Sequence, residues 1–269
     1  MTDFARRVAA LVGIPEAGLE SLVGDSLSEV LLVRRPNGIC SVAKSGPAIG
    51  IEAAMLRTLA GFGIPVPAVE AEHEGVLMLE HIENDGVFSP KAWADIGLQL
   101  RRLHSRSGEG YGWPVDYALG TVKLDNRERG DWPGFWAGQR LIATASILDR
   151  PWRERVEQLA ARLGDLLPPA PSPALLHGDL WTGNMLVREG SLVGFIDPAC
   201  YHGHAEVDLA MLDLFCSPPE EFREGYGEIE PGWLQRQPIY QLFPALVHLR
   251  LWGQGYEKMV DRLLTALGA

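Results

Sequence analysis

The fold of this chain is decided by the stretch Leu175-Leu176-His177-Gly178-Asp179-Leu180-Trp181-Thr182-Gly183-Asn184. A short interval later comes the stretch Val193-Gly194-Phe195-Ile196-Asp197-Pro198. Together they place a His-x-Asp-x-x-x-x-Asn segment ahead of a second aspartate at the end of an apolar run. A lone His-x-Asp pair is a weak signal, but three residue types at this spacing with a distal aspartate are hard to produce by chance.

These residue types at this spacing indicate a phosphotransferase that uses Mg·ATP. Phosphoryl transfer requires little covalent chemistry from the protein, but the hydroxyl nucleophile must be aimed and the phosphate charge neutralised. We expect Asp179, with His177 and Asn184 in the same catalytic segment, to orient the acceptor hydroxyl and take its proton. We expect Asn184 and Asp197 to bind Mg²⁺ through hard oxygen ligands.

The composition is that of an ordinary globular protein. The chain has 269 residues, of which 46% are hydrophobic, enough for a sizeable core. Its 24 Lys and Arg residues face 35 Asp and Glu residues, and the resulting net charge of −11 would repel a nucleic acid. No apolar run approaches the ~18 residues of a membrane span, and the three cysteines form no Cys-x-x-Cys pair. We therefore expect a soluble cytoplasmic protein with reduced thiols and no nucleic-acid or membrane partner; the sequence leaves the oligomeric state open.

The order of predicted elements indicates an α+β chain with two lobes. Residues 1–82 are expected to form a small antiparallel sheet with one prominent helix, and residues 83–269 a mainly helical lobe. The expected strands are 29–34, 39–44 and 76–80, and the expected helices are 4–11, 48–60, 90–105, one from about 131, 151–166, 206–215 and much of 233–269. Short strands flank the catalytic segment, and residues 110–130 are expected to form a connection.

The first lobe supplies a second group of candidate residues. Lys44 ends the second expected strand, and Glu52 lies eight residues later inside the following helix. The two are expected to form the ion pair that holds a lysine against the α- and β-phosphates of ATP. The loop Gly24-Asp25-Ser26-Leu27-Ser28 precedes the hairpin where a turn that covers phosphates belongs, but with one glycine it is a weak motif.

Taken together, three segments resemble the fructosamine kinase (ketosamine 3-kinase) family, whose relatives include the aminoglycoside phosphotransferases. They are the catalytic segment with its tryptophan after Asp179-Leu180, the run Ile196 to His204, and Glu206-Val207-Asp208-Leu209-Ala210-Met211. The resemblance extends to Asp131 through Leu141, Leu79 through Ile82 and Tyr240 through Tyr256. The family's Gly-Gly-x-Ile-Asn type of loop differs here, where residues 24–28 stand.

The resemblance implies a protein-kinase-like two-lobe fold, with ATP between the lobes and its adenine at the hinge residues Glu80, His81 and Ile82. It implies transfer of the γ-phosphoryl group to the 3-hydroxyl of a ketosamine, whose product then falls apart and frees the amine, a deglycation reaction. The partner would be a small ketosamine or a glycated amine on a protein. Trp181 is expected to pack against the sugar-amine as a rigid wall.

The same resemblance also bears on other polar residues near the motifs. Asp208 sits in an apolar helix and is expected to brace the catalytic loop. His204 and Glu206 are candidates for contact with the acceptor or for bracing, and His248 is a candidate for the acceptor pocket or for the core.

Two other functions stay open from the residues. The first is a kinase for another small alcohol, such as an aminoglycoside, a choline-like amine or a plain sugar, and Trp181 with Gly203-His204-Ala205-Glu206 distinguishes it from a ketosamine kinase. The second is a pseudokinase that binds nucleotide and regulates a partner; the intact Lys44, Asp179, Asn184 and Asp197 count against it. The sequence does not say which ketosamine is used.

Overall fold

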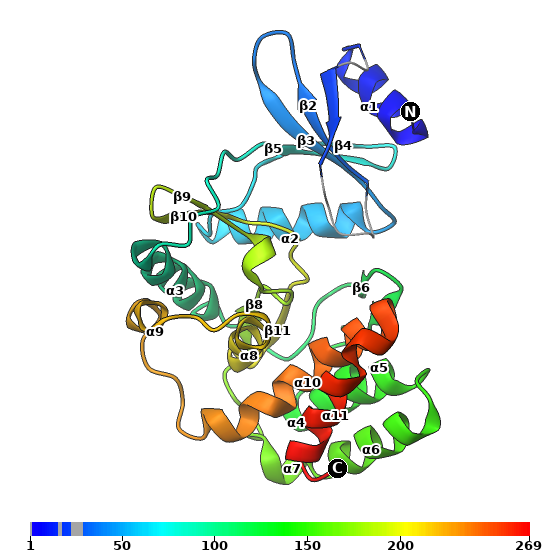
Figure 1. Ribbon diagram of the computed structural model, residues 1–269, viewed down its shortest axis with the longest axis vertical. Helices are drawn as coiled ribbons and strands as arrows, with labels where there is room; N and C mark the ends of the chain where they lie inside the picture. Colours follow the sequence, from blue (N-terminus) through cyan, green and yellow to red (C-terminus); the bar gives the residue numbers. More distant parts are fainter. Residues whose placement is uncertain (1, 16–17, 23–28) are drawn as a thin grey trace.

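The smaller lobe is built on a five-stranded antiparallel sheet in the order β1-β2-β3-β5-β4, at the top of Figure 1. The structure is a computed structural model, which describes residues 2–15, 18–22 and 29–269. Two helices accompany the sheet. The bounds in this lobe are α1 Asp3–Val12, β1 Leu19–Ser21, β2 Val30–Arg34, β3 Cys40–Ser45, α2 Ile49–Gly61, β4 Val69–His73 and β5 Val76–Glu80.

Both faces of this sheet are covered, which explains the continuous apolar run of β5. Val76 and Met78 pack in one core cluster with residues of α1, and Leu77 and Leu79 pack in another with residues of α2. Lys44 of β3 is paired with Leu77 in the antiparallel register, so its side chain shares the face toward α2. The lysine is thereby directed at the helix that carries its expected partner.

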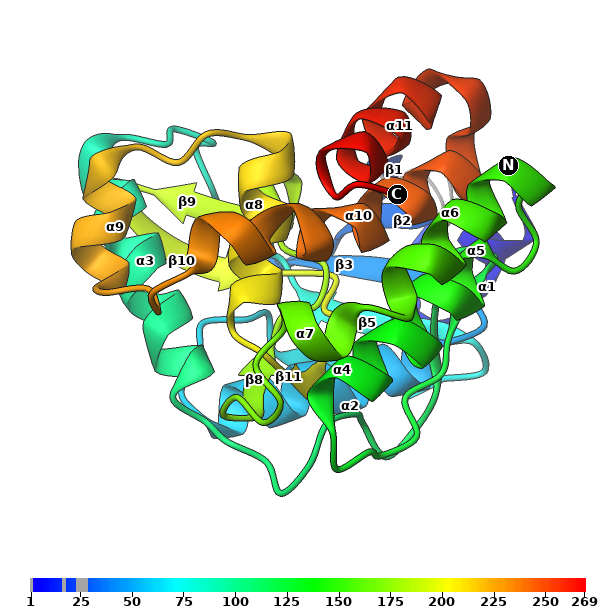
Figure 2. The ribbon, with the colours of Figure 1, turned by 90° about the horizontal axis from the view of Figure 1, so that it is seen from below.

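The larger lobe is mainly helical (Figure 1), and its described residues form three two-stranded antiparallel sheets between the helices. In Figure 2, seen from below, α10 crosses the lobe and packs against both α8 and α11. The helices are α3 Pro90–His104, α4 Trp132–Phe135, a π-helix Trp136–Ile142, α5 Ala143–Ala145, α6 Arg150–Ala160, α7 Leu163–Leu166, α8 Glu206–Phe215, α9 Glu220–Tyr226, α10 Trp233–Trp252 and α11 Glu257–Ala266. The strands are β6 Tyr117–Leu119, β7 Val122–Leu124, β8 Ala174–Leu176, β9 Met185–Arg188, β10 Ser191–Phe195 and β11 Tyr201–Gly203.

Two of these strand pairs carry the catalytic segment. β8 pairs with β11 and β9 pairs with β10, both antiparallel. His177 follows β8, Asn184 precedes β9, and Asp197 follows β10. Because the second pair is inserted between the strands of the first, the three residues return to the same place although twenty positions separate the outer two.

The α+β, two-lobed architecture expected from the sequence is confirmed, and two of the expected segments are corrected. The connection 110–130 contains the hairpin β6–β7, which turns at Gly120 with a φ of +56°. The single helix expected over 151–166 is two helices, α6 and α7. Helices occupy much of 233–269, as expected; they are α10 and α11, separated at Gly253, where φ is +72° and a 3₁₀ turn (Gly253–Tyr256) begins.

Two further sequence expectations concern cysteines and membrane spans. Cys40, Cys200 and Cys216 all lie in the described part of the chain, and none of them forms a disulfide. None of the helices within residues 2–15, 18–22 and 29–269 has both the length and the apolar composition needed to cross a bilayer.

Candidate active site

The loop that follows β8 is held by one buried carboxylate, that of Asp208 in α8. Asp208 accepts hydrogen bonds from the backbone N–H groups of His177 (2.7 Å) and Gly178 (2.9 Å), and from Nε2 of His104 (3.1 Å). Burial by itself would raise the pKa of this carboxyl, but the hydrogen bond and charge of His104 lead the interactions that lower it. Asp208 therefore stays charged and braces the loop, as the sequence led us to expect.

Gly178 fits a place that no other residue can occupy without movement. Its φ is +82°, and a Cβ on this residue would lie 2.1 Å from the carbonyl oxygen of Ala199. A hydrogen bond joins the same two backbone segments, because the Ala199 N–H donates to the His177 carbonyl over 2.8 Å. The close approach explains the glycine between the histidine and the aspartate of the motif.

His177 is fully buried and contacts the backbone of the site rather than the cavity. The Asp179 N–H donates to its Nδ1 over 3.3 Å, so the proton lies on Nε2, which donates to the Ile196 carbonyl over 3.0 Å. Burial lowers the pKa of the imidazole, which keeps the ring neutral. The expected catalytic contact of His177 is thus replaced by a bracing one, which ties the loop to the residue before Asp197.

Asn184 binds back onto the aspartate five residues earlier. Its Nδ2 donates to the Asp179 carbonyl over 2.9 Å and to Asp179 Oδ2 over 3.1 Å. Because both interactions use the amide nitrogen, the amide oxygen of Asn184 remains the ligand-type atom of this side chain. The structure thus brings the aspartate and the asparagine of the motif into direct contact.

Lys44 joins the two lobes through carboxylates from each of them. Its Nζ lies 2.7 Å from Glu52 Oε1 and 2.5 Å from Asp197 Oδ1, and the lysine is 7% exposed. Burial would lower the pKa of this ammonium, but the two carboxylates outweigh burial and raise it, so the lysine stays charged. Asp197 has a φ of +54°, an uncommon backbone for a non-glycine residue, and its carboxylate is aimed at the lysine from that position.

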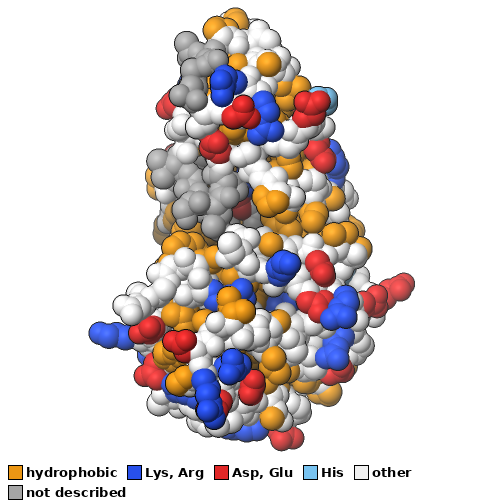
Figure 3. All heavy atoms as spheres, turned by 90° about the vertical axis from the view of Figure 1, so that its right-hand side faces the viewer, with side chains coloured by type: hydrophobic (Ala, Val, Ile, Leu, Met, Phe, Trp, Pro, Cys, Tyr) orange, Lys and Arg blue, Asp and Glu red, His pale blue; other side chains and the backbone are white. Residues whose placement is uncertain are grey.

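Lys44, Glu52, Asp179 and Asp197 line one cavity of about 650 Å³, whose lining comes from both lobes. Trp181 stands in this lining with 41% of its surface exposed, which is unusual for a large aromatic side chain. On the face in Figure 3, hydrophobic side chains gather at the level where the lobes meet. The described lining residues are Lys44–Ile49, Glu52, Tyr117–Thr121, Asp179, Trp181, Asp197, Met211, Phe215, Val247, His248, Leu251, Trp252 and Tyr256.

The expected hinge residues lie where β5 leaves the sheet. Glu80 exchanges hydrogen bonds with Ala68: its N–H donates to the Ala68 carbonyl over 2.9 Å, and its carboxylate accepts from the Ala68 N–H over 3.1 Å. Ile82 lies against β10, since a Cβ on Gly194 would be 2.8 Å from its Cδ1. His81 stands between them, and none of the three is among the described residues that line the cavity. The expected loop 24–28 lies outside the described residues.

His204 and Glu206 are almost fully buried, 3% and 2% exposed. Glu206 forms a two-pronged ion pair with Arg236, in which Nε donates to Oε2 over 2.8 Å and Nη2 contacts Oε1. His204 Nδ1 lies 2.8 Å from the hydroxyl oxygen of Tyr240. Neither residue lines the cavity, so the structure does not bring them to the expected acceptor site, and it supports the bracing alternative.

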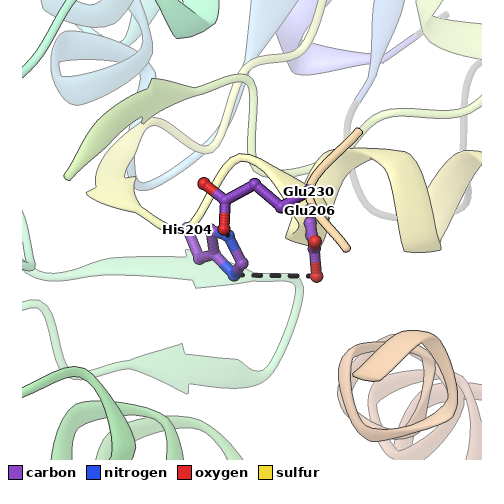
Figure 4. Close-up of side chains that lie close together, drawn as sticks. All are labelled: His204, Glu206 and Glu230. Atoms are coloured by element: carbon purple, nitrogen blue, oxygen red, sulfur yellow. Dashed lines mark ion pairs between the residues drawn. The ribbon is translucent and has the colours of Figure 1, made fainter. Parts of the chain in front are cut away.

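Figure 4 shows His204 and Glu206 converging with Glu230, a grouping that offers atoms a metal ion could use. The carboxylate of Glu230 lies 3.7 Å from His204 Nε2. The guanidinium of Arg236, however, holds both oxygens of Glu206 and also donates to the carbonyls of Pro231 and Glu230. The positive charge of Arg236 already balances the Glu206 carboxylate. We therefore interpret the group as a structural ion pair that holds the loop before α10 to α8.

Several residues of the site were missed by sequence reasoning. Tyr117 and the rest of the β6–β7 turn line the cavity, as do Phe215, Trp252 and Tyr256. Burial, followed by the charge of Glu52, raises the pKa of Tyr117, so it stays a neutral phenol. No spacing pattern links these aromatic residues to the motif; the clustering of aromatic residues near the C-terminal end of the chain was the available signal.

Comparison with known proteins gives one consistent result. The sequence model described as fructosamine kinase matches residues 46–268. A protein named probable ketoamine kinase from Thermus thermophilus is 34% identical over 266 residues, which cover 93% of this chain and 97% of that protein. The crystal structure of a provisionally named fructosamine-3-kinase from Thermobifida fusca superposes with a TM-score of 0.86 at 30% identity, over 98% of both chains. An aminoglycoside phosphotransferase solved with gentamicin shares the fold, with a TM-score of 0.67 at 19% identity over 99% of this chain and 95% of the other.

Proposed function

This chain belongs to the fructosamine kinase family, a family of phosphotransferases, and we propose that it transfers the γ-phosphoryl group of ATP to the sugar 3-hydroxyl of a ketosamine. The observation that carries the proposal is the convergence of Lys44, Asp179, Trp181 and Asp197 on one cavity between the lobes. In this proposal Lys44 is the phosphate-binding cation, Asp179 the base, Trp181 the wall of the acceptor site and Asp197 a metal ligand, and all four line the same cavity. The phosphorylated product then falls apart and frees the amine, which makes the reaction a deglycation.

The smaller lobe, residues 1–82, is the nucleotide-binding lobe in this proposal. Lys44 stays charged between two carboxylates and binds the α- and β-phosphates, while Glu52 fixes its position. The adenine lies against the backbone of Glu80, His81 and Ile82 where β5 ends. Residues 83–269 form the lobe that holds the catalytic loop and the acceptor.

The donor set also fits Mg²⁺. Both interactions of Asn184 with Asp179 use the amide nitrogen, which leaves an amide oxygen, and the side chain of Asp197 is 39% exposed with one oxygen on Lys44. Hard oxygen atoms of this kind are what Mg²⁺ prefers. Asn184 and Asp197 would hold the ion, which supplies charge neutralisation for the β- and γ-phosphates.

Asp179 is the base in this proposal. Its backbone is fixed by His177 and by the amide of Asn184, so its carboxylate is held at the cavity in one position. A positioned carboxylate aims the acceptor hydroxyl and takes its proton as the phosphoryl group is transferred. Trp181, two residues further on and 41% exposed, covers the sugar-amine of the acceptor.

The test is an ADP-release assay across a panel of acceptors: a fructosamine, a ribulosamine, free fructose, an aminoglycoside and choline. The proposal predicts turnover with the ketosamines and background rates with the others. Turnover confined to the aminoglycoside or to choline would favour the other class of small-molecule kinase. Nucleotide binding without turnover of any alcohol would favour the pseudokinase.

A further inference from the structure

Four aromatic side chains of the larger lobe form one continuous wall of the cavity. The wall consists of Phe215 from the end of α8, His248 and Trp252 from α10, and Tyr256 from the following turn. His248 lies at its centre, with ring centroids 4.6 Å from Phe215, 4.6 Å from Trp252 and 4.9 Å from Tyr256. We refer to these four residues as the aromatic wall.

The aromatic wall is partly exposed although it is built of large rings. Trp252 is 45% exposed, and Trp181, which lines the same cavity from the catalytic loop, is 41% exposed. Large aromatic surfaces left open inside a concave site are typical of places where a ligand packs. Two half-open indoles from distant parts of the sequence thus face one space beside the catalytic aspartate.

The charges around this space are distributed unevenly. Among the cavity-lining residues that the structure describes, the permanently charged ones are Lys44, Glu52, Asp179 and Asp197. Lys44 is already bonded to two of the three carboxylates. The aromatic wall itself contributes neither a basic nor an acidic side chain apart from its histidine.

That histidine is not a cation either. Nδ1 of His248 lies 2.8 Å from the Pro244 carbonyl, which can only accept, so Nδ1 carries the ring proton. Burial lowers the pKa of the ring, so the imidazole is neutral at neutral pH. The wall therefore offers aromatic faces and one nitrogen lone pair, but no positive charge for an anionic group.

We propose that the aromatic wall is the specificity-determining subsite for the substituent on the acceptor's amine, and that it selects an apolar or aromatic substituent over one that carries a carboxylate. The proposal rests on the ketosamine kinase function proposed above. An apolar substituent buries its surface on the rings, and the amine it carries, protonated near neutral pH, meets aromatic faces and Asp179. A carboxylate placed there would lose water without gaining a cation and would be repelled by Asp179.

Two ketosamines with the same sugar test this selection: the fructosamine of benzylamine and the fructosamine of glycine. We expect the wild-type enzyme to have a KM for the benzylamine conjugate lower by about tenfold or more. Trp252→Ala should remove most of this difference, with the KM for ATP unchanged within about twofold. Trp252→Arg, at a half-exposed position that tolerates a long side chain, should reverse the preference toward the glycine conjugate.

The controls separate the wall from general destabilisation. Leu234→Ala changes another exposed apolar side chain of α10, 70% exposed and outside the cavity lining, and should leave the KM ratio as in the wild type. Trp252→Phe keeps a ring and should keep most of the preference. Equal KM values for the two conjugates in the wild type, or a Trp252→Ala variant that raises both KM values equally, would overturn the proposal.

Direct binding separates this proposal from the function on which it rests. If neither conjugate is phosphorylated, the ketosamine function fails, and calorimetric titration of benzylamine into the wild type and Trp252→Ala then decides the subsite. Saturable binding that the substitution weakens by about tenfold supports an apolar amine subsite. No binding, or equal binding to both proteins, overturns it.

Discussion

Replacing Asp208 with asparagine changes almost no volume but removes the charge that holds the catalytic loop. In the wild type, Oδ1 accepts from Gly178 N–H, and Oδ2 accepts from His177 N–H and His104 Nε2. An asparagine in this place can be oriented in two ways. In one, its NH₂ group faces the N–H of Gly178; in the other, it faces both the N–H of His177 and Nε2 of His104. One or two buried donors left unpaired, at about 1–3 kcal/mol each, predict a loss of about 1–6 kcal/mol in the free energy of unfolding.

Thermal unfolding and steady-state kinetics measure this effect together. For a chain of this size we expect Tm to fall by at least about 2 °C. Because the loop that carries Asp179 is no longer fixed, kcat should fall by about 10- to 100-fold while the KM for ATP changes little. Asp213→Asn is the matched control: it lies in the same helix, bonds to Gln237 instead, and should leave kcat unchanged. An Asp208→Asn variant with wild-type Tm and kcat would refute the bracing role.

The pH dependence has a defined sign. The pKa of Asp208 is lower in the folded chain than its ordinary value, mainly because the bonding and charge of His104 outweigh burial. A depressed pKa gives stability that is present above the unfolded-state value of about 3.9 and is lost as pH falls through the folded-state pKa. The Tm difference between wild type and Asp208→Asn should therefore be widest near neutral pH and narrow below about pH 4.

Three more substitutions test the remaining parts of the site. Asp179→Asn should reduce turnover by about 10²- to 10⁴-fold and leave ATP affinity nearly unchanged; near-normal turnover would remove it as the base. Asp197→Ala should abolish activity and the Mg²⁺ dependence of nucleotide binding, and calorimetry with equal metal dependence in both proteins would make it structural. Gly178→Ala should cost about 2–5 kcal/mol in chemical denaturation, because a Cβ would lie 2.1 Å from a carbonyl oxygen. Gly38→Ala is the control: Gly38 also has a positive φ, +83°, but a Cβ there would contact nothing. This variant should therefore lose less stability than Gly178→Ala, because only the backbone strain is added.

The elements nearest the motif were predictable because local sequence determines them. The strand that ends at Lys44 and the helix that carries Glu52 follow from apolar spacing, and the two-lobe order follows from strands first and helices after. The short strands that flank Asp179 and Asp197 were indicated because each polar residue ends or follows a short apolar run, but their nested pairing was not.

The rest depends on contacts between distant parts of the chain. His204 and Glu206 looked equally suited to a substrate or to the core, and the choice is made by Arg236 and Tyr240, thirty and thirty-six residues away from their partners. Distant partners also accompany the π-helix that contains the buried Arg140. Arg140 donates to the carbonyl of Asp125, and the neighbouring Gln139 donates to the carbonyl of Arg127. No periodicity in the sequence encodes such partners.

The position of the phosphate on the product tests the proposed reaction most directly. Phosphorus NMR of the product formed from ATP and a fructosamine is predicted to show a single phosphate ester on the sugar 3-hydroxyl. A phosphate on any other hydroxyl, or turnover confined to aminoglycosides or choline-like amines, would contradict the ketosamine 3-kinase function.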